Sequence, residues 1–133
     1  MIKVQYAVLA EFQRDTDLIG TFDRIKTPRI PAQQRNLVFV VLLVSDSLED
    51  AGPRDVIIKC VLPTGKPIFE QAARIDMKAS DDSTWLASAR IAFEAQGMPL
   101  PLEGRYSFVL EMNGEPIASH AFTVVLTPQT STP

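Results

Sequence analysis

The hydrophobic pattern of this chain is dominated by an uninterrupted apolar run from Leu37 to Val44. The run reads Leu-Val-Phe-Val-Val-Leu-Leu-Val, and half of its residues are valine. A short run that is rich in β-branched residues predicts a strand buried on both faces, and it is too short to cross a membrane as a helix. We therefore expect a central strand in which Phe39, Val40, Val41 and Leu42 are almost inaccessible to solvent.

Most of the remaining chain alternates between apolar and polar positions, which is typical of half-buried strands. The segment 68–77 would also suit a helical turn, and we favour a strand there. Polar or proline-rich segments separate the strands, so we expect a connector at 28–36, where the chain crosses between sheets, and loops at 45–53 and 97–103. The further strands that this pattern predicts lie at 2–12, 18–26, 55–62, 68–77, 85–93, 106–112 and 116–126.

The number and spacing of these strands indicate the fold class. About eight strands with regular turn signals and no long helix are the pattern of an all-β sandwich. The length of 133 residues fits a single domain. We predict one β-sandwich domain of mostly antiparallel strands at 1–126, followed by a polar C-terminal tail at 127–133.

Three segments in the first third of the chain carry a family resemblance. They read Tyr-Ala-Val-Leu-Ala-Glu at 6–11, Gly-Thr-Phe-Asp-Arg-Ile at 20–25 and Pro-Arg-Ile-Pro at 28–31. Together they resemble the opening of a bacterial domain-of-unknown-function family. The resemblance implies a β-rich fold and supplies no catalytic residue.

A second resemblance lies near the C-terminus, at Glu103-Gly104-Arg105-Tyr106-Ser107-Phe108. This segment is similar to the tyrosine corner of immunoglobulin-like sandwiches, in which a tyrosine hydroxyl bonds to nearby backbone. It favours an immunoglobulin-like sandwich over a barrel.

The last two strands are joined at Asn113-Gly114, and the loop length decides which residues face the core. A two-residue loop would pair Phe108 with Ser119. A three-residue loop at 112–114 would pair Phe108 with Ala118 and Tyr106 with His120. We favour the three-residue loop because it places the apolar residues of both strands on one face.

Composition and charge exclude several functions. The net charge of -3 and the scattered basic residues argue against nucleic acid and anionic membranes as partners. Cys60 is the only cysteine, so no intramolecular disulfide can form, which indicates a reducing compartment. The N-terminal residues lack the features of a signal peptide. We expect a protein of the bacterial cytoplasm.

Candidate catalytic chemistry is sparse. His120 is the only histidine, and Asp23, Asp76 or Glu111 could orient it in an enzyme. The alternative is a structural histidine that bonds to backbone or to the Tyr106 hydroxyl, which we favour.

Cys60 lies on an apolar strand face, where a thiol is buried and inert. Acidic residues gather in two groups that could bind calcium, although neither has the spacing of an EF-hand. We interpret them as solvated loop residues and predict no catalytic residue, no cofactor and no metal. The two groups are Asp46, Glu49, Asp50 and Asp55, and Asp76, Asp81 and Asp82.

Four residues are candidates for interactions: Trp85, as an interface anchor, and the basic cluster of Arg24, Lys26 and Arg29. We predict a non-enzymatic binding or assembly module that engages a protein partner or pairs with itself, as a homodimer, through an edge strand. The alternatives are a small-molecule or metal-dependent enzyme that acts at the loop end of the sandwich, and a carbohydrate-binding module that uses Trp85.

Overall fold

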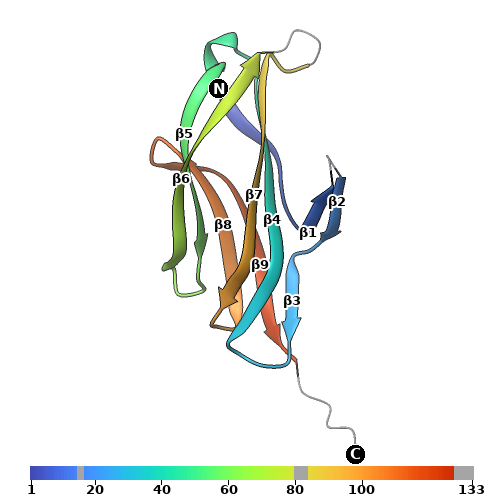
Figure 1. Ribbon diagram of the computed structural model, residues 1–133. Helices are drawn as coiled ribbons and strands as arrows, with labels where there is room; N and C mark the ends of the chain where they lie inside the picture. Colours follow the sequence, from blue (N-terminus) through green and yellow to red (C-terminus); the bar gives the residue numbers. More distant parts are fainter. Residues whose placement is uncertain (15–16, 80–83, 128–133) are drawn as a thin grey trace, which may run out of the picture.

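The computed structural model describes residues 1–14, 17–79 and 84–127, which form an all-β fold (Figure 1). A single helical turn, η1 (Leu48–Asp50), lies between strands. No helix in the described part of the chain is long and apolar enough to span a membrane. The described residues form nine strands: β1 (Ile2–Arg14), β2 (Asp17–Thr21), β3 (Arg24–Thr27), β4 (Ala32–Ser45), β5 (Gly52–Val61), β6 (Pro67–Ala79), β7 (Ala87–Leu100), β8 (Gly104–Met112) and β9 (Glu115–Leu126).

The strands form one curled sheet in the order β2-β1-β4-β7-β6-β5-β8-β9-β3. Neighbouring strands are antiparallel except for β3 and β9, which are parallel. Consecutive strands β2 and β3 therefore lie at opposite ends of the sheet. Phe22 and Asp23 connect them: the Phe22 N–H donates to the Leu9 carbonyl at 3.0 Å, and the Asp23 carbonyl accepts from Thr123 N–H at 2.9 Å.

This break explains why the predicted strand count was too low. The single strand expected at 18–26 is two strands, which pair with β1 and with β9. The connector expected at 28–36 is also shorter, because β4 already begins at Ala32.

The apolar run at 37–44 lies in β4, between β1 and β7, as the sequence predicts. Phe39, Val40 and Val41 are at most 1% exposed. Leu42 is only half-buried, so its predicted inaccessibility was wrong. It pairs with Tyr6 and Arg90 on the outer face of the sheet, and both of these residues are exposed.

The core lies inside the curl, where the two halves of the sheet face each other. Phe39 of β4 packs on Phe108 of β8, with ring centroids 5.1 Å apart. Phe69 of β6 stacks on Phe93 of β7 at 5.4 Å. These ring pairs join the half that contains β4 and β7 to the half that contains β5, β6 and β8.

Strand β1 contains a bulge that the alternating pattern does not reveal. The register with β4 shifts between Val4 and Tyr6. A one-residue shift moves the following side chains to the opposite face. As a result Leu9 lies opposite Phe39 and is buried in the core, whereas Phe12, which strict alternation from Val4 would place on the same face as Val4, is 48% exposed.

The segment 68–77 is a strand, as we favoured, and belongs to β6. The loop expected at 97–103 was wrong in its first half, because β7 continues through Pro99 to Leu100. Pro99 pairs with Gln33 near the end of β7, whose other side has no strand partner there within 1–14, 17–79 and 84–127. Proline is tolerated at such a position, because a strand forms no ladder hydrogen bonds on a side that lacks a neighbouring strand.

The hairpin between β8 and β9 has the two-residue loop that we rejected. Asn113 and Gly114 both have positive φ, 54° and 78°, which is the geometry of a type I′ turn. A register shift between Leu110 and Glu111 then pairs Leu110 with Ala118 and Phe108 with His120. The bulge restores the shared apolar face that we had assigned to a longer loop.

Tyr106 forms the bonds expected of a tyrosine corner. Its hydroxyl donates to the Leu102 carbonyl at 2.6 Å and accepts from the Leu102 N–H at 3.0 Å. The side chain is fully buried and stacks on Phe122. Burial raises the pKa of the Tyr106 phenol, so the hydroxyl remains a donor at neutral pH.

Candidate functional site

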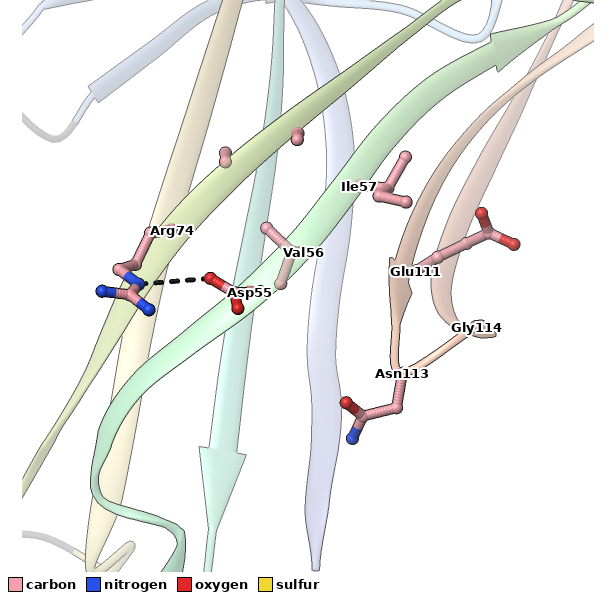
Figure 2. Close-up of a pocket in the computed structure, with 9 residues that line it drawn as sticks. Asp55, Val56, Ile57, Arg74, Glu111, Asn113 and Gly114 are labelled. Carbon is pink, nitrogen blue, oxygen red and sulfur yellow. Dashed lines mark hydrogen bonds and ion pairs between the residues drawn. The ribbon is translucent and has the colours of Figure 1, made fainter.

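A groove of about 570 Å³ lies on the outer face of β5, β6 and β8 (Figure 2). Its floor is apolar, because Ile57 and Ala72 pair across β5 and β6 and both point outward. Ile57 is 38% exposed, which is high for a large apolar side chain in the middle of a sheet. The residues that line the groove are Asp55, Val56, Ile57, Ala72, Ala73, Arg74, Glu111, Asn113 and Gly114.

Charged side chains surround this apolar floor in opposed pairs. Arg74 Nε lies 3.2 Å from Asp55 Oδ1, and the two residues are direct partners in the β5–β6 ladder (Figure 2). Lys59 Nζ lies 3.2 Å from Glu111 Oε1, and both of these side chains are largely shielded from solvent. Glu70 of β6 is the residue directly opposite Lys59 in the β5–β6 ladder. The outer face therefore carries an apolar centre between two charged rows.

Among the residues that the structure describes, strand β6 has an unpaired edge beside this groove. Its residues Pro67–Met77 pair with β5 on one side, whereas only Lys78 and Ala79 pair with β7 on the other. Strand β7 also has an edge without a partner in the described ranges, because its pairing with β6 stops at Ser88. A further hollow of about 540 Å³ marks the wedge where β6 and β7 separate.

These open edges are features that sequence reasoning missed. The first strand, which has no proline, was our candidate for the pairing edge; β1 pairs with β4 on one side, and on the other side β2 pairs only with its second half. A signal for the β6 edge was present, since Glu70, Ala72 and Arg74 alternate with inward-facing residues. The pattern alone does not tell which strand lacks a neighbour.

Trp85 does not open a strand, since β7 begins two residues later. The Lys3 ammonium lies 4.5 Å from the centroid of the Trp85 ring, within the range of a cation–π contact. Trp85 is half-buried. The indole therefore links β1 to the segment before β7.

The three basic candidates lie at one end of the sheet. Arg24 and Lys26 are exposed on β3, the terminal strand of the order, and Arg29 is exposed just beyond it. Thr27 Oγ1 donates to the Arg29 carbonyl at 2.9 Å and so holds the turn. The structure brings these residues near each other but places Trp85 elsewhere, before β7.

His120 does not make the contacts that the sequence suggested. The Tyr106 hydroxyl bonds to Leu102, and Tyr106 pairs with Phe122 instead of His120. Within the described residues, His120 Nε2 is buried without a hydrogen-bond partner. Together with Thr21 and Asp23, His120 lines a hollow of about 320 Å³. Asp76 and Glu111 line other hollows.

Cys60 is buried in the core with no exposed surface, as predicted. Burial raises the pKa of its thiol to about 12. The thiolate is the reactive form of cysteine, so Cys60 is inert at neutral pH.

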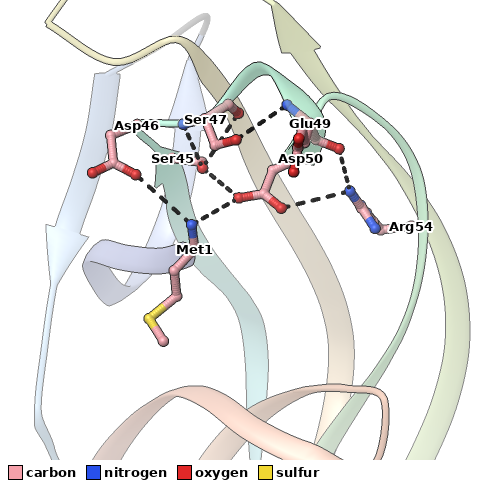
Figure 3. A network of polar contacts seen from close by, with 7 residues as sticks. All are labelled: Met1, Ser45, Asp46, Ser47, Glu49, Asp50 and Arg54. Atoms are coloured by element: carbon pink, nitrogen blue, oxygen red, sulfur yellow. Dashed lines mark hydrogen bonds and ion pairs between the residues drawn. The ribbon is translucent and has the colours of Figure 1, made fainter.

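The acidic residues at 46–50 surround cations that belong to the chain itself (Figure 3). The Met1 amine lies 3.0 Å from Asp50 and 3.7 Å from Asp46, and Arg54 lies 3.8 Å from Asp50. A hydrogen bond from Ser45 and the Met1 amine lower the pKa of the Asp50 carboxyl. Within 1–14, 17–79 and 84–127, no three metal-ligating side chains gather, and Asp81 and Asp82 lie outside the described residues.

Three solved structures align with most of this chain at low sequence identity. A β-glucosidase from Listeria innocua aligns with 97% of this chain, at a TM-score of 0.51 and 10% identity, over 16% of its own length. An immunoglobulin-like protein from Pseudomonas aeruginosa aligns over 93% of this chain and 96% of its own, at a TM-score of 0.47 and 10% identity.

The alkylpurine DNA glycosylase AlkC from Pseudomonas fluorescens aligns over 93% of this chain at 16% identity and a TM-score of 0.48. This chain spans only 30% of that glycosylase. No curated protein matches the sequence significantly. The family model of DUF6941, a family of unknown function, matches residues 5–125, and the chain belongs to this family.

Proposed function

We propose that this protein is a non-enzymatic binding or assembly module of the bacterial cytoplasm that pairs a free strand edge with another protein chain. The observation that carries the proposal is the pair of open edges on β6 and β7. An unpaired edge offers a row of N–H and C=O groups that a further strand can pair with.

The sequence along these edges supports pairing. Proline and inward-pointing charges are the usual means of blocking an edge. Proline occurs here only near the ends, at Pro67 and Pro99, and the residues at 68–77 and 89–96 contain none. The inward-facing side chains of this stretch of β7, Ala89, Ile91, Phe93 and Ala95, are apolar and half-buried. An added strand would cover them.

We further propose that the curled sheet is an immunoglobulin-like sandwich in which β6 contributes to both layers. The tyrosine corner at Tyr106 and the parallel pairing of β3 with β9 support this interpretation. In such a sandwich the free edges of β6 and β7 lie on the side where these two strands separate, and a further strand can be added there.

Site-specific cross-linking tests the proposal. A photoreactive residue would be placed at Ala72 on β6 or at Ala92 on β7, both exposed, with Glu115 in the exposed β8–β9 turn as the control position. After expression in the native cell, we expect discrete covalent adducts from Ala72 or Ala92 and none from Glu115. Equal adducts from all three positions, or none from either edge, would contradict the proposal.

A small-molecule enzyme is the second candidate function, favoured by the hollow that contains His120 and Asp23. A buried Nε2 without a partner among the described residues is available to a ligand. The carbohydrate-binding alternative has less support, because the Trp85 ring already carries the Lys3 ammonium.

A further inference from the structure

We propose that two copies of this chain form an antiparallel pair along the free edges of β6, about a two-fold axis at Ala72. This inference rests on the proposed function and names the strand partner as a second copy. It would join two curled sheets into one continuous sheet through β6.

The extent of the free edge fits this symmetry. The edge runs from Pro67 to Met77, and Ala72 is its middle residue. An antiparallel pair centred there places Pro67 of the second copy opposite Met77. It ends before Lys78, where pairing with β7 begins. The whole free edge is thus used without displacing an existing strand.

The charges of the outer face are complementary in this register. Glu70 lies opposite Arg74 of the second copy, and Arg74 lies opposite its Glu70. Within each chain the β5 ladder partners of Glu70 and Arg74 are Lys59 and Asp55. Each row across the interface would therefore alternate in sign, because Lys59, Glu70, the second copy's Arg74 and its Asp55 follow one another.

The centre of the interface would be apolar. Ala72 meets Ala72 of the second copy, and each is flanked by the exposed Ile57 of its own chain. The two outer-face grooves would thereby become contiguous across the axis. On the inner face, Phe69 lies opposite Ile75 of the second copy, and both are half-buried in the single chain. Pairing would remove this apolar surface from water.

Neighbouring registers of β6 lack this complementarity. A pair centred on Ala73 would place Glu70 opposite Asp76, which is a like-charge contact. A pair centred on Gln71 would place Glu70 opposite Ala72 and Arg74 opposite Ile68. Of these three registers, only the one centred on Ala72 forms both ion pairs.

The edge of β7 is also self-complementary, since a pair centred on Ala92 would oppose Arg90 and Glu94. That register, however, places Gln96 of the second copy opposite Ser88, a position already occupied by Lys78 of β6. Arg90 and Glu94 are also both bonded to Gln13, at 3.2 and 3.4 Å. We therefore assign the self-pairing edge to β6.

Charge reversal tests the assignment. Sedimentation velocity should show wild-type protein at twice the monomer mass at micromolar to submillimolar concentration. Glu70→Arg or Arg74→Glu should each weaken dimerisation by about tenfold or more, because each variant creates two like-charge contacts across the axis. An equimolar mixture of the two variants should dimerise again. In the mixed pair, the arginine introduced at position 70 faces the glutamate introduced at position 74 of the other copy, and the native Arg74–Glu70 contact is kept.

Arg90→Glu serves as the matched control and should leave the dimer intact, and thermal melts should show that every variant is folded. A monomeric wild type, a dimer insensitive to both reversals, or a dimer lost with Arg90→Glu would overturn the proposal. Failure of self-pairing is distinguishable from failure of the proposed function. In the first case Ala72 or Ala92 still cross-links to a different protein, and in the second neither position forms a discrete adduct.

Discussion

The rings of Phe39 and Phe108 lie 5.1 Å apart between centroids, at an interplanar angle of 32°, and join the two halves of the sheet. Both side chains are fully buried, and Phe108 also contacts Phe69 and Phe122. The contact lies near the centre of the core, so it should respond strongly to truncation.

Phe39→Ala should lower the free energy of unfolding by about 3–5 kcal/mol, through lost burial and the cavity left behind. Urea unfolding followed by fluorescence or circular dichroism measures the change. Phe12→Ala, at an exposed phenylalanine, is the matched control and should cost less than about 1 kcal/mol. Similar losses for the two variants would contradict the central position of Phe39.

Tyr106→Phe removes the hydroxyl that bonds to Leu102 while it retains the buried ring. The Leu102 N–H and carbonyl then lose their partner, and we expect a loss of about 1–3 kcal/mol. Tyr6→Phe, at an exposed tyrosine, should change stability by at most about 0.5 kcal/mol. An unchanged melting temperature for Tyr106→Phe would show that the tyrosine corner does not stabilise this fold.

The Cys60 thiol should resist alkylation in the native protein at pH 8 and react fully in denaturant. Burial raises its pKa from the ordinary value of 9.0 to about 12. The protonated thiol thus contributes stability that is fully present below pH 9 and is lost as the pH rises toward 12. Cys60→Ser should remove the part of the stability loss at alkaline pH that ionisation of this thiol causes. Rapid native alkylation would show that the core opens locally.

His120→Phe should leave stability unchanged or raise it by up to about 1 kcal/mol, because a ring of similar size replaces a buried nitrogen that lacks a partner within the described residues. Thermal melts measure this effect, and the cross-links from Ala72 and Ala92 should persist. Loss of a cellular function with unchanged stability and intact cross-links would instead support the second candidate, an enzyme at the His120 hollow.

The sequence was most informative where burial alone decides the structure. The apolar run at 37–44 identified the buried part of β4, and the apolar surroundings of Cys60 indicated its burial. The strand at 68–77 was also predicted, although Glu70–Arg74 would suit a helix. In each case the hydrophobic pattern matches the side that the fold covers.

Register and neighbours were harder to predict because they depend on single residues and distant partners. The bulge at Val4–Tyr6 reverses a face without any glycine or proline to mark it. The register shift between Leu110 and Glu111 offsets the two-residue turn, so the apolar residues share one face as they would with a three-residue turn. The open edge of β6 depends on where β7 departs after Ser88, which local pattern does not encode.

The parallel contact between β3 and β9 has a kinetic consequence. The Thr127 N–H donates to the Thr27 carbonyl at 2.8 Å, and these residues are 100 positions apart in the chain. Closing so long a loop is entropically costly before other contacts hold the ends together. This pair should therefore form late in folding. The folding time should be set by long-range closure, in the range of roughly milliseconds to seconds that is typical of all-β domains.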